Sequence, residues 1–255
     1  MSETPSVLRH LLPNRRATAA LWAIDARSVA RDGLLAVTLA MPLLVALAVR
    51  YGTPPLAAAL KTHLAFDLVP YYPLIMSNLV VIAVNTVGGM IGFMMLDERD
   101  DGTVKALRVT PVPVRAYLAY RLGVPTVLAF VMTLVCYPLA GLTPLPFAAL
   151  VPIAACGALL APAMALFLAA TAANKVAGLA LFKLVGGVLN IPLIAYFVPP
   201  VWQPLFGVVP TFWPMKAVWA GAESGAAWPY LVAGTALSFV AIVLLARRLA
   251  ARAVD

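Results

Sequence analysis

Charged residues are scarce in this chain of 255 residues: they make up 11% of it, whereas hydrophobic residues make up 63%. Soluble domains average about 25% charged and about 45–50% apolar residues. A soluble globule of this length could not bury so much apolar surface. The composition therefore excludes an ordinary cytosolic enzyme and a disordered chain, and it predicts an all-α, polytopic membrane protein.

Cysteine and histidine are also scarce, with two of each. Cys136 and Cys156 lie in apolar runs with no histidine or aspartate nearby, so we expect buried packing residues rather than metal ligands. The chain contains no G-x-x-x-x-G-K-[ST] sequence and no serine nucleophile elbow. No basic patch is interleaved with aromatic residues in the manner of a nucleic-acid site. The sequence therefore predicts no catalytic group, metal site or cofactor in this chain, and no nucleic-acid partner.

The apolar runs divide the chain into a surface helix and six spans, which we interpret as one transmembrane domain. Residues 14–32 place Trp22 and Val29 on one face of a basic helix, which is typical of a helix lying along a membrane; a solvated helix is the alternative. Residues 50–73 are expected as a loop on the outer side of the membrane, and residues 199–229 as a segment on the same side. The six spans are expected at residues 34–49, 74–96, 122–140, 147–173, 176–198 and 230–246.

Basic residues are divided unequally between the two sides of the membrane. The N-terminus, the 97–121 loop, the 174–183 stretch and the C-terminus together hold 15 Lys and Arg residues. The opposite side holds three, which are Arg50, Lys61 and Lys216. Because cytoplasmic loops carry an excess of Lys and Arg, this bias predicts a multi-pass protein of the cell membrane with both termini in the cytoplasm.

The densest polar feature follows the second span, where residues 97–101 contain four acids in five positions. Asp100 or Asp101 can cap a short helix from residue 103 to residue 109, and Pro111 would end that helix. A short amphipathic helix held close to the membrane is suited to docking into a groove on a partner protein. A solvated loop is the alternative interpretation.

Two other functional classes compete with docking. The acids could hold a divalent cation in a membrane enzyme that transfers phospho-alcohol groups. Such enzymes need further aspartates downstream, but no Asp or Glu occurs between Asp101 and Glu223. An ion-coupled secondary transporter is the third class, and the lack of acids inside the spans argues against proton coupling.

Polar and small residues inside the spans form two helical stripes. The members are Asn78, Asn85, Gly89 and Gly92 in the second span, and Lys183, Gly186, Gly187 and Asn190 in the fifth. Polar groups in lipid usually face protein or water, and small residues let helices approach closely. The stripes therefore indicate either helix packing or the walls of a substrate path that includes Asn78, Asn85, Asn190 and Lys183. Lys183 could instead extend its amine toward the cytoplasmic surface.

Four of the five tryptophans lie between the last two spans, at Trp202, Trp213, Trp219 and Trp228. Tryptophans concentrate at the membrane–water interface, so an aromatic belt is one interpretation. A re-entrant helical pair over residues 199–206 and 211–220, capping the exit of a substrate path, is the other.

The run from Leu96 to Val112, LDERDDGTVKALRVTPV, resembles the cytoplasmic loop after the second span of type-2 ABC transporter permeases. In that family an acidic–basic run is followed by Gly-Thr, then a Leu, then Thr/Ser-Pro. Val104 and Lys105 depart from the Leu-Glu that many relatives carry. The LDERD run and residues 67–75, DLVPYYPLI, are similar to the fluoroquinolone-export permeases of actinobacteria.

The resemblance implies a permease subunit that hydrolyses no ATP itself. A separate ABC ATPase subunit would bind ATP and Mg and dock on a coupling helix within residues 97–115, and a second permease, identical or related, would pair with this one in the bilayer. The cargo would be an amphipathic drug-like or lipid-like compound that leaves the cell, because the spans offer few charges to hold a polar solute. The expected coupling residues are Asp97, Glu98, Arg99, Asp101, Gly102, Thr103, Lys105, Leu107, Arg108, Thr110 and Pro111.

Overall fold

The computed structural model describes residues 33–102, 114–223 and 225–252, and these residues form helices without any strand. The predicted all-α fold is therefore confirmed for the described part of the chain. The elements are α2 (Gly33–Leu64), η2 (Val69–Tyr71), α3 (Tyr72–Asp100), α5 (Val114–Ala140), α6 (Phe147–Ala158), α7 (Leu160–Thr171), α8 (Lys175–Asn190), η3 (Ile191–Phe197), η4 (Gln203–Val208), α9 (Phe212–Ala222) and α10 (Trp228–Arg252).

Six apolar helical segments among the described residues are long enough to cross a membrane, and each overlaps one predicted span. They comprise residues 36–64, 69–100, 119–140, 147–171, 175–197 and 228–249. The predicted surface helix at residues 14–32 lies outside the described residues.

The first span differs most from its predicted bounds, because α2 continues past Val49 to Leu64. The loop predicted from residue 50 is therefore wrong for residues 50–64. Lys61 is the only Lys, Arg, Asp or Glu from residue 51 to residue 64, and residues 56–60 read LAAAL, so the segment favours a helix. Pro54 and Pro55 lie inside this helix and do not end it.

Two other spans are interrupted helices. The fourth consists of α6 and α7, which are separated at Leu159. The fifth begins as α8 and tightens at Ile191 into the 3-10 helix η3, where Pro192 lacks the amide hydrogen that an α-helix needs.

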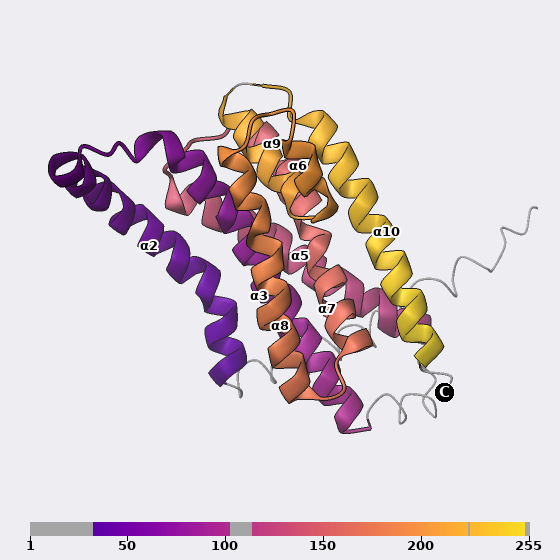
Figure 1. The fold of residues 1–255 in the computed structure, drawn as a ribbon. Coiled ribbons are helices and arrows are strands. Elements are labelled where there is room, and N and C mark those ends of the chain that lie inside the picture. The colour runs from indigo at the N-terminus through magenta and orange to yellow at the C-terminus, as the bar shows by residue number, and fades with distance from the viewer. Residues whose placement is uncertain (1–32, 103–113, 224, 253–255) are drawn as a thin grey trace, which may run out of the picture.

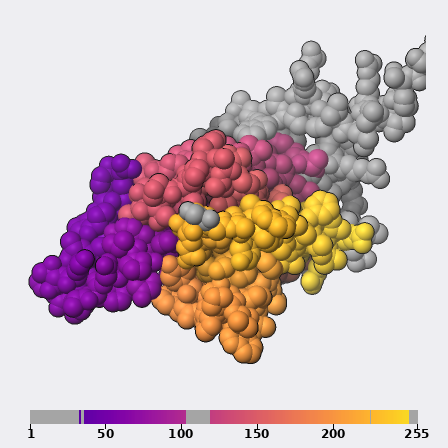
Figure 2. All heavy atoms as spheres, turned by 90° about the horizontal axis from the view of Figure 1, so that it is seen from above, coloured from indigo at the N-terminus to yellow at the C-terminus, as the bar shows by residue number. Residues whose placement is uncertain are grey.

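Burial separates inner helices from outer ones. In the most apolar stretch of α3, 83% is buried, and in that of the α6–α7 segment 78% is buried. The corresponding stretches of the α2 and α10 segments are only 17% and 11% buried. Figure 1 shows α2 leaning out on one side of the bundle and α10 on the other, and in the space-filling view they lie in different parts of the molecule (Figure 2). The core is therefore centred on α3, which packs against α2, α5, α7, α8 and α9.

The segment between the last two spans packs onto this core as η4 and α9. Trp219 of α9 is 2% exposed and donates its indole N–H to the hydroxyl of Ser77 in α3 over 2.9 Å. Trp202 and Trp228 are 60% and 68% exposed. An aromatic belt at the membrane interface is therefore compatible with Trp202 and Trp228, but not with Trp219, which is a core residue. The prediction that the segment re-enters the membrane stays a prediction.

Candidate functional site

The last turn of α3 carries a group of charged residues that contact three other helices. Asp97, Glu98 and Arg99 all lie within α3, whose expected end was Leu96. Each of their side chains has a partner in another part of the fold. We call these residues and their two basic partners the α3 ion cluster: Asp97, Glu98, Arg99, Arg121 and Lys175.

Glu98 forms an ion pair with Arg121 of α5. The Arg121 side chain is 1% exposed and that of Glu98 is 21% exposed, so water screens the pair poorly. The guanidinium of Arg121 also lies 5.5 Å from the ring centroid of Tyr120. A buried guanidinium needs a compensating charge, and Glu98 supplies it.

Arg99 contacts the C-terminal end of α7. Its guanidinium donates hydrogen bonds to the carbonyl of Ala169 in the last turn of α7 over 3.4 Å, to that of the C-cap residue Ala172 over 3.0 Å and to that of Ala173, just beyond the helix, over 2.7 Å. The last carbonyls of a helix have no partner inside that helix and carry partial negative charge. Arg99 therefore satisfies these acceptors with a cation and fixes the end of α3 to the end of α7.

Asp97 contacts the start of α8. Its Oδ2 atom lies 2.9 Å from Nζ of Lys175, the first residue of that helix. Asn174 caps the same helix, because its side-chain oxygen accepts a hydrogen bond from the amide of Ala177 over 2.9 Å. Both charged side chains are more than a third exposed, so this pair is weaker than the Glu98–Arg121 pair.

The α3 ion cluster gives a role to two of the four acids at residues 97–101. Asp97 and Glu98 neutralise bases of neighbouring helices, a role that the sequence analysis did not predict. Asp101 is the C-cap of α3, and Gly102 follows with φ +71°, the left-handed conformation that ends many helices. The predicted helix from residue 103 to residue 109 lies outside the described residues. The same holds for six of the expected coupling residues: Thr103, Lys105, Leu107, Arg108, Thr110 and Pro111.

Arg121 and Lys175 were missed as site residues. Their sequence neighbourhoods gave a weak signal, since each is a lone base at the edge of an apolar run and was counted only toward orientation. The acids that form ion pairs with them lie on α3. These charges come together only because α3 packs against α5 and α8.

The asparagines of the second span are half-buried and lack complete hydrogen bonding. The Oδ1 atoms of Asn78 and Asn85 are buried and accept no hydrogen bond within the described structure. Asn78 lines a cavity of about 260 Å³ between α2, α3 and η3, together with residues such as Val45, Ile82 and Leu193. An unpaired amide oxygen beside a cavity is available to a ligand that carries a hydrogen-bond donor.

The other residues of the two polar stripes do not line this cavity with unpaired polar groups. A Cβ atom on Gly89 would lie 2.3 Å from the ring of Phe182, and one on Gly92 would lie 2.7 Å from Leu168, so both glycines pack against neighbouring helices. Asn190 donates to the carbonyl of Gly186 over 2.7 Å within its own helix. Lys183 is exposed on α8 and does not line the cavity. The two polar stripes meet at one point, where a Cβ atom on Gly186 would lie 3.2 Å from Nδ2 of Asn85. This contact favours helix packing there, and the substrate path stays a prediction.

Six apolar helical segments among the described residues, with α3 and α6–α7 buried among the other four, define a multi-pass integral membrane protein. The chain belongs to the Rv2686c-like family of fluoroquinolones export permease proteins, which matches residues 25–246. This membership confirms the resemblance noted in the sequence and assigns the chain to membrane permeases rather than to enzymes.

Two curated relatives are similar to almost the whole chain. They are the fluoroquinolones export permease proteins Rv2686c and MT2760 of two Mycobacterium tuberculosis strains, H37Rv and CDC 1551. Each is 35% identical over 246 residues, which cover 94% of this chain and 97% of the relative. No solved structure matches the chain significantly.

Proposed function

We propose that this chain is the membrane-spanning subunit of an ATP-driven exporter. It would move an amphipathic drug-like or lipid-like compound out of the cell while a separate ABC ATPase subunit binds ATP and Mg. Both relatives carry names as fluoroquinolones export permeases, and identity of 35% over 94% of the chain supports a planar, amphipathic drug as cargo.

The α3 ion cluster is the observation that carries the proposed coupling to an ATPase. The connection between α3 and α5 begins beside Glu98 and leads into the helix that holds Arg121. Arg99 and Asp97 tie the same end of α3 to α7 and α8. A partner that pulls on this connection would therefore move the ends of four helices together. Coupling of this kind requires that the partner contacts the two states differently.

The proposed substrate path follows the asparagine face of α3. An amphipathic compound needs an apolar surface and few polar contacts, which Asn78 and Asn85 would supply. The cavity beside Asn78 measures about 260 Å³, whereas drug-sized ligands occupy pockets of about 300–1,000 Å³. A second permease, identical or related, would complete the path. Asn190 and Lys183 of α8 would border it, with Lys183 near the cytoplasmic side.

The enzyme alternative has less support, because the carboxylates of Asp97 and Glu98 are paired with Lys175 and Arg121. An ion-coupled transporter would move cargo without any ATPase. The proposed orientation, with both termini and the 97–121 loop in the cytoplasm, rests on the distribution of basic residues.

The test is affinity purification of tagged protein from its native membrane in mild detergent, followed by mass spectrometry. The wild type is compared with a Lys105→Glu/Arg108→Glu variant in the proposed docking segment and with a Lys61→Glu control at the opposite end of the bundle. Charge reversal should repel a complementary partner surface, so we expect at least a tenfold loss of an ABC ATPase with the double variant and none with the control. Glu98 is left unchanged because its loss would disturb the fold.

Equal recovery of the ATPase with both variants would contradict docking at this segment. A permease that purifies alone at every detergent strength would contradict the subunit assignment. Inverted membrane vesicles then test transport: ATP-dependent, uncoupler-resistant uptake of a fluoroquinolone supports the proposal, and uptake that collapses with the proton gradient supports the ion-coupled alternative.

A further inference from the structure

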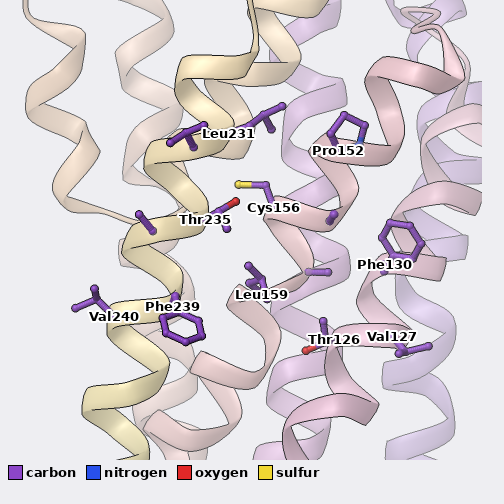
Figure 3. Close-up of a pocket in the computed structure, with 14 residues that line it drawn as sticks. Thr126, Val127, Phe130, Pro152, Cys156, Leu159, Leu231, Thr235, Phe239 and Val240 are labelled. Carbon is purple, nitrogen blue, oxygen red and sulfur yellow. The ribbon is translucent and has the colours of Figure 1, made fainter.

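An apolar groove lies on the side of the bundle formed by α5, α6 and α10. Its volume is about 1020 Å³. Figure 3 shows Phe130 and Val127 of α5 on one wall, Leu231 and Phe239 of α10 on the other, and Cys156 between them. This groove is distinct from the cavity beside Asn78 and from the α3 ion cluster.

Helix packing explains why the groove stays open. Both α5 and α10 pack against α6 and α7, so they straddle the fourth span. The floor between them is made of small residues, including Ala155 and Ala158, near the break between α6 and α7 at Leu159. The groove extends about 14 Å along α10, because Leu231 and Val240 are nine residues apart and a helix rises about 1.5 Å per residue.

The chemistry of the groove excludes a polar ligand. No charged residue among those that the structure describes lines it. The hydroxyl of Thr126 donates to the carbonyl of Leu122 over 2.8 Å, and Thr235 forms a hydrogen bond with the thiol of Cys156. The polar side chains that line the groove are thus already engaged within the chain. Water needs two to four polar partners to occupy a hollow, so hydrocarbon fits this surface better than water does.

The position of the groove identifies its occupant. All three walls belong to membrane-spanning segments. The walls continue into the exposed apolar surface of the same helices, where Val131 is 48% exposed and Val232 is 63% exposed. This surface meets the bilayer, so lipid chains have direct access to the groove. We propose that the groove binds an acyl chain of a membrane phospholipid in a defined site, and this inference does not depend on the proposed transport function.

The experiment is native mass spectrometry of delipidated full-length protein titrated with dioleoyl phosphatidylcholine. An Ala155→Leu/Ala236→Leu variant fills the groove, and Ala48→Leu adds the same side chain to an exposed position of α2. We expect one tight lipid adduct on the wild type and the control, and affinity about tenfold lower for the filled variant. Ala236→Asn, which places an amide in the groove at little cost in volume, should weaken the adduct as well.

Equal lipid affinity in the wild type, the filled variant and the Ala236→Asn variant would overturn the proposal. Efficient disulfide cross-linking between two copies through Val240→Cys, in a Cys136→Ala/Cys156→Ala background, would also overturn it. In that case the groove would hold a second copy of the chain. Undiminished affinity in Ala236→Asn would contradict an acyl-chain site that depends on the apolar chemistry of the groove, even if the filled variant loses the adduct.

Discussion

Arg121 shows how much one buried side chain can determine at the end of a helical bundle. It is 1% exposed, and its guanidinium is compensated by Glu98 from another helix. Replacing a buried pair by apolar residues is often tolerated, whereas removing one member leaves an uncompensated charge. Asp97 and Lys175 form a pair of the same type in a more exposed place, where water weakens the interaction.

The first prediction compares these two pairs. Glu98→Ala should lower the free energy of unfolding by about 3–5 kcal/mol, because it strands the buried Arg121. Asp97→Ala should cost about 0–1 kcal/mol, because Lys175 remains partly hydrated. Chemical unfolding in detergent micelles, followed by circular dichroism, measures both. Equal losses for the two variants would refute the difference in burial on which the prediction rests.

A double variant separates charge from packing. Glu98→Leu/Arg121→Leu removes both charges and should recover part of the stability lost in Glu98→Ala. A double variant less stable than Glu98→Ala would show that Arg121 stabilises the fold through contacts other than the ion pair.

At the scale of elements, α3 is the helix around which the others are arranged. It approaches α7 closely at Gly88, where a Cβ atom would lie 2.6 Å from the carbonyl oxygen of Ala161 and 2.8 Å from Cβ of Met164. A backbone carbonyl cannot rotate away as the tip of a flexible side chain can. Small residues of this kind let membrane helices pack by van der Waals contact, since lipid gives no hydrophobic force between them.

The second prediction concerns this contact. Gly88→Ala should destabilise the protein by about 1–3 kcal/mol, because α3 and α7 must separate to accept the methyl group. Gly187→Ala in α8 is the matched control, since a Cβ there meets nothing within 4 Å. The control should be neutral or gain up to about 1 kcal/mol, because alanine favours a helix more than glycine does. Thermal unfolding midpoints measure both, and similar shifts would contradict close packing at Gly88.

At the scale of the whole molecule, the helices sort into two inner spans and four outer ones. The α6–α7 segment and α3 are mostly buried. The segments of α2, α8–η3 and α10 expose most of their apolar stretches to the surroundings. This arrangement suits a bilayer, where exposed apolar faces carry no penalty. Two exposed bases lie at the ends of spans, Lys61 near the end of α2 and Arg248 near the end of α10.

The third prediction tests the orientation of this bundle. Lys61→Cys and Arg248→Cys are placed singly in a Cys136→Ala/Cys156→Ala background and treated with a membrane-impermeant maleimide in sealed right-side-out vesicles. We expect label on Lys61→Cys at once and on Arg248→Cys only after the vesicles are opened, because basic residues concentrate on the cytoplasmic side. The reverse pattern would invert the orientation and contradict a cytoplasmic 97–121 loop.

Much of the fold could be predicted from sequence, but less of the candidate site. The six spans follow from local hydropathy, and the structure contains a long apolar helical segment for each. The end of α2 was not predicted, because Arg50 interrupts the apolar run at the predicted end of the span, yet the helix continues past it to Leu64. Asp97 and Glu98 were recognised as unusual acids in the sequence. Their partners could not be predicted, because they lie 78 and 23 residues away in the chain.

The sequence by itself determined the membrane class, the number of spans and the all-α fold, because the cost of placing charge in lipid is a property of each segment alone. Tertiary structure decided which helices are inner and outer, which charges pair and where a groove stays open. Those features depend on side chains that approach each other from distant parts of the chain. Trp219 illustrates the difference: its sequence position is typical of a membrane interface, and its packing against Ser77 makes it a core residue.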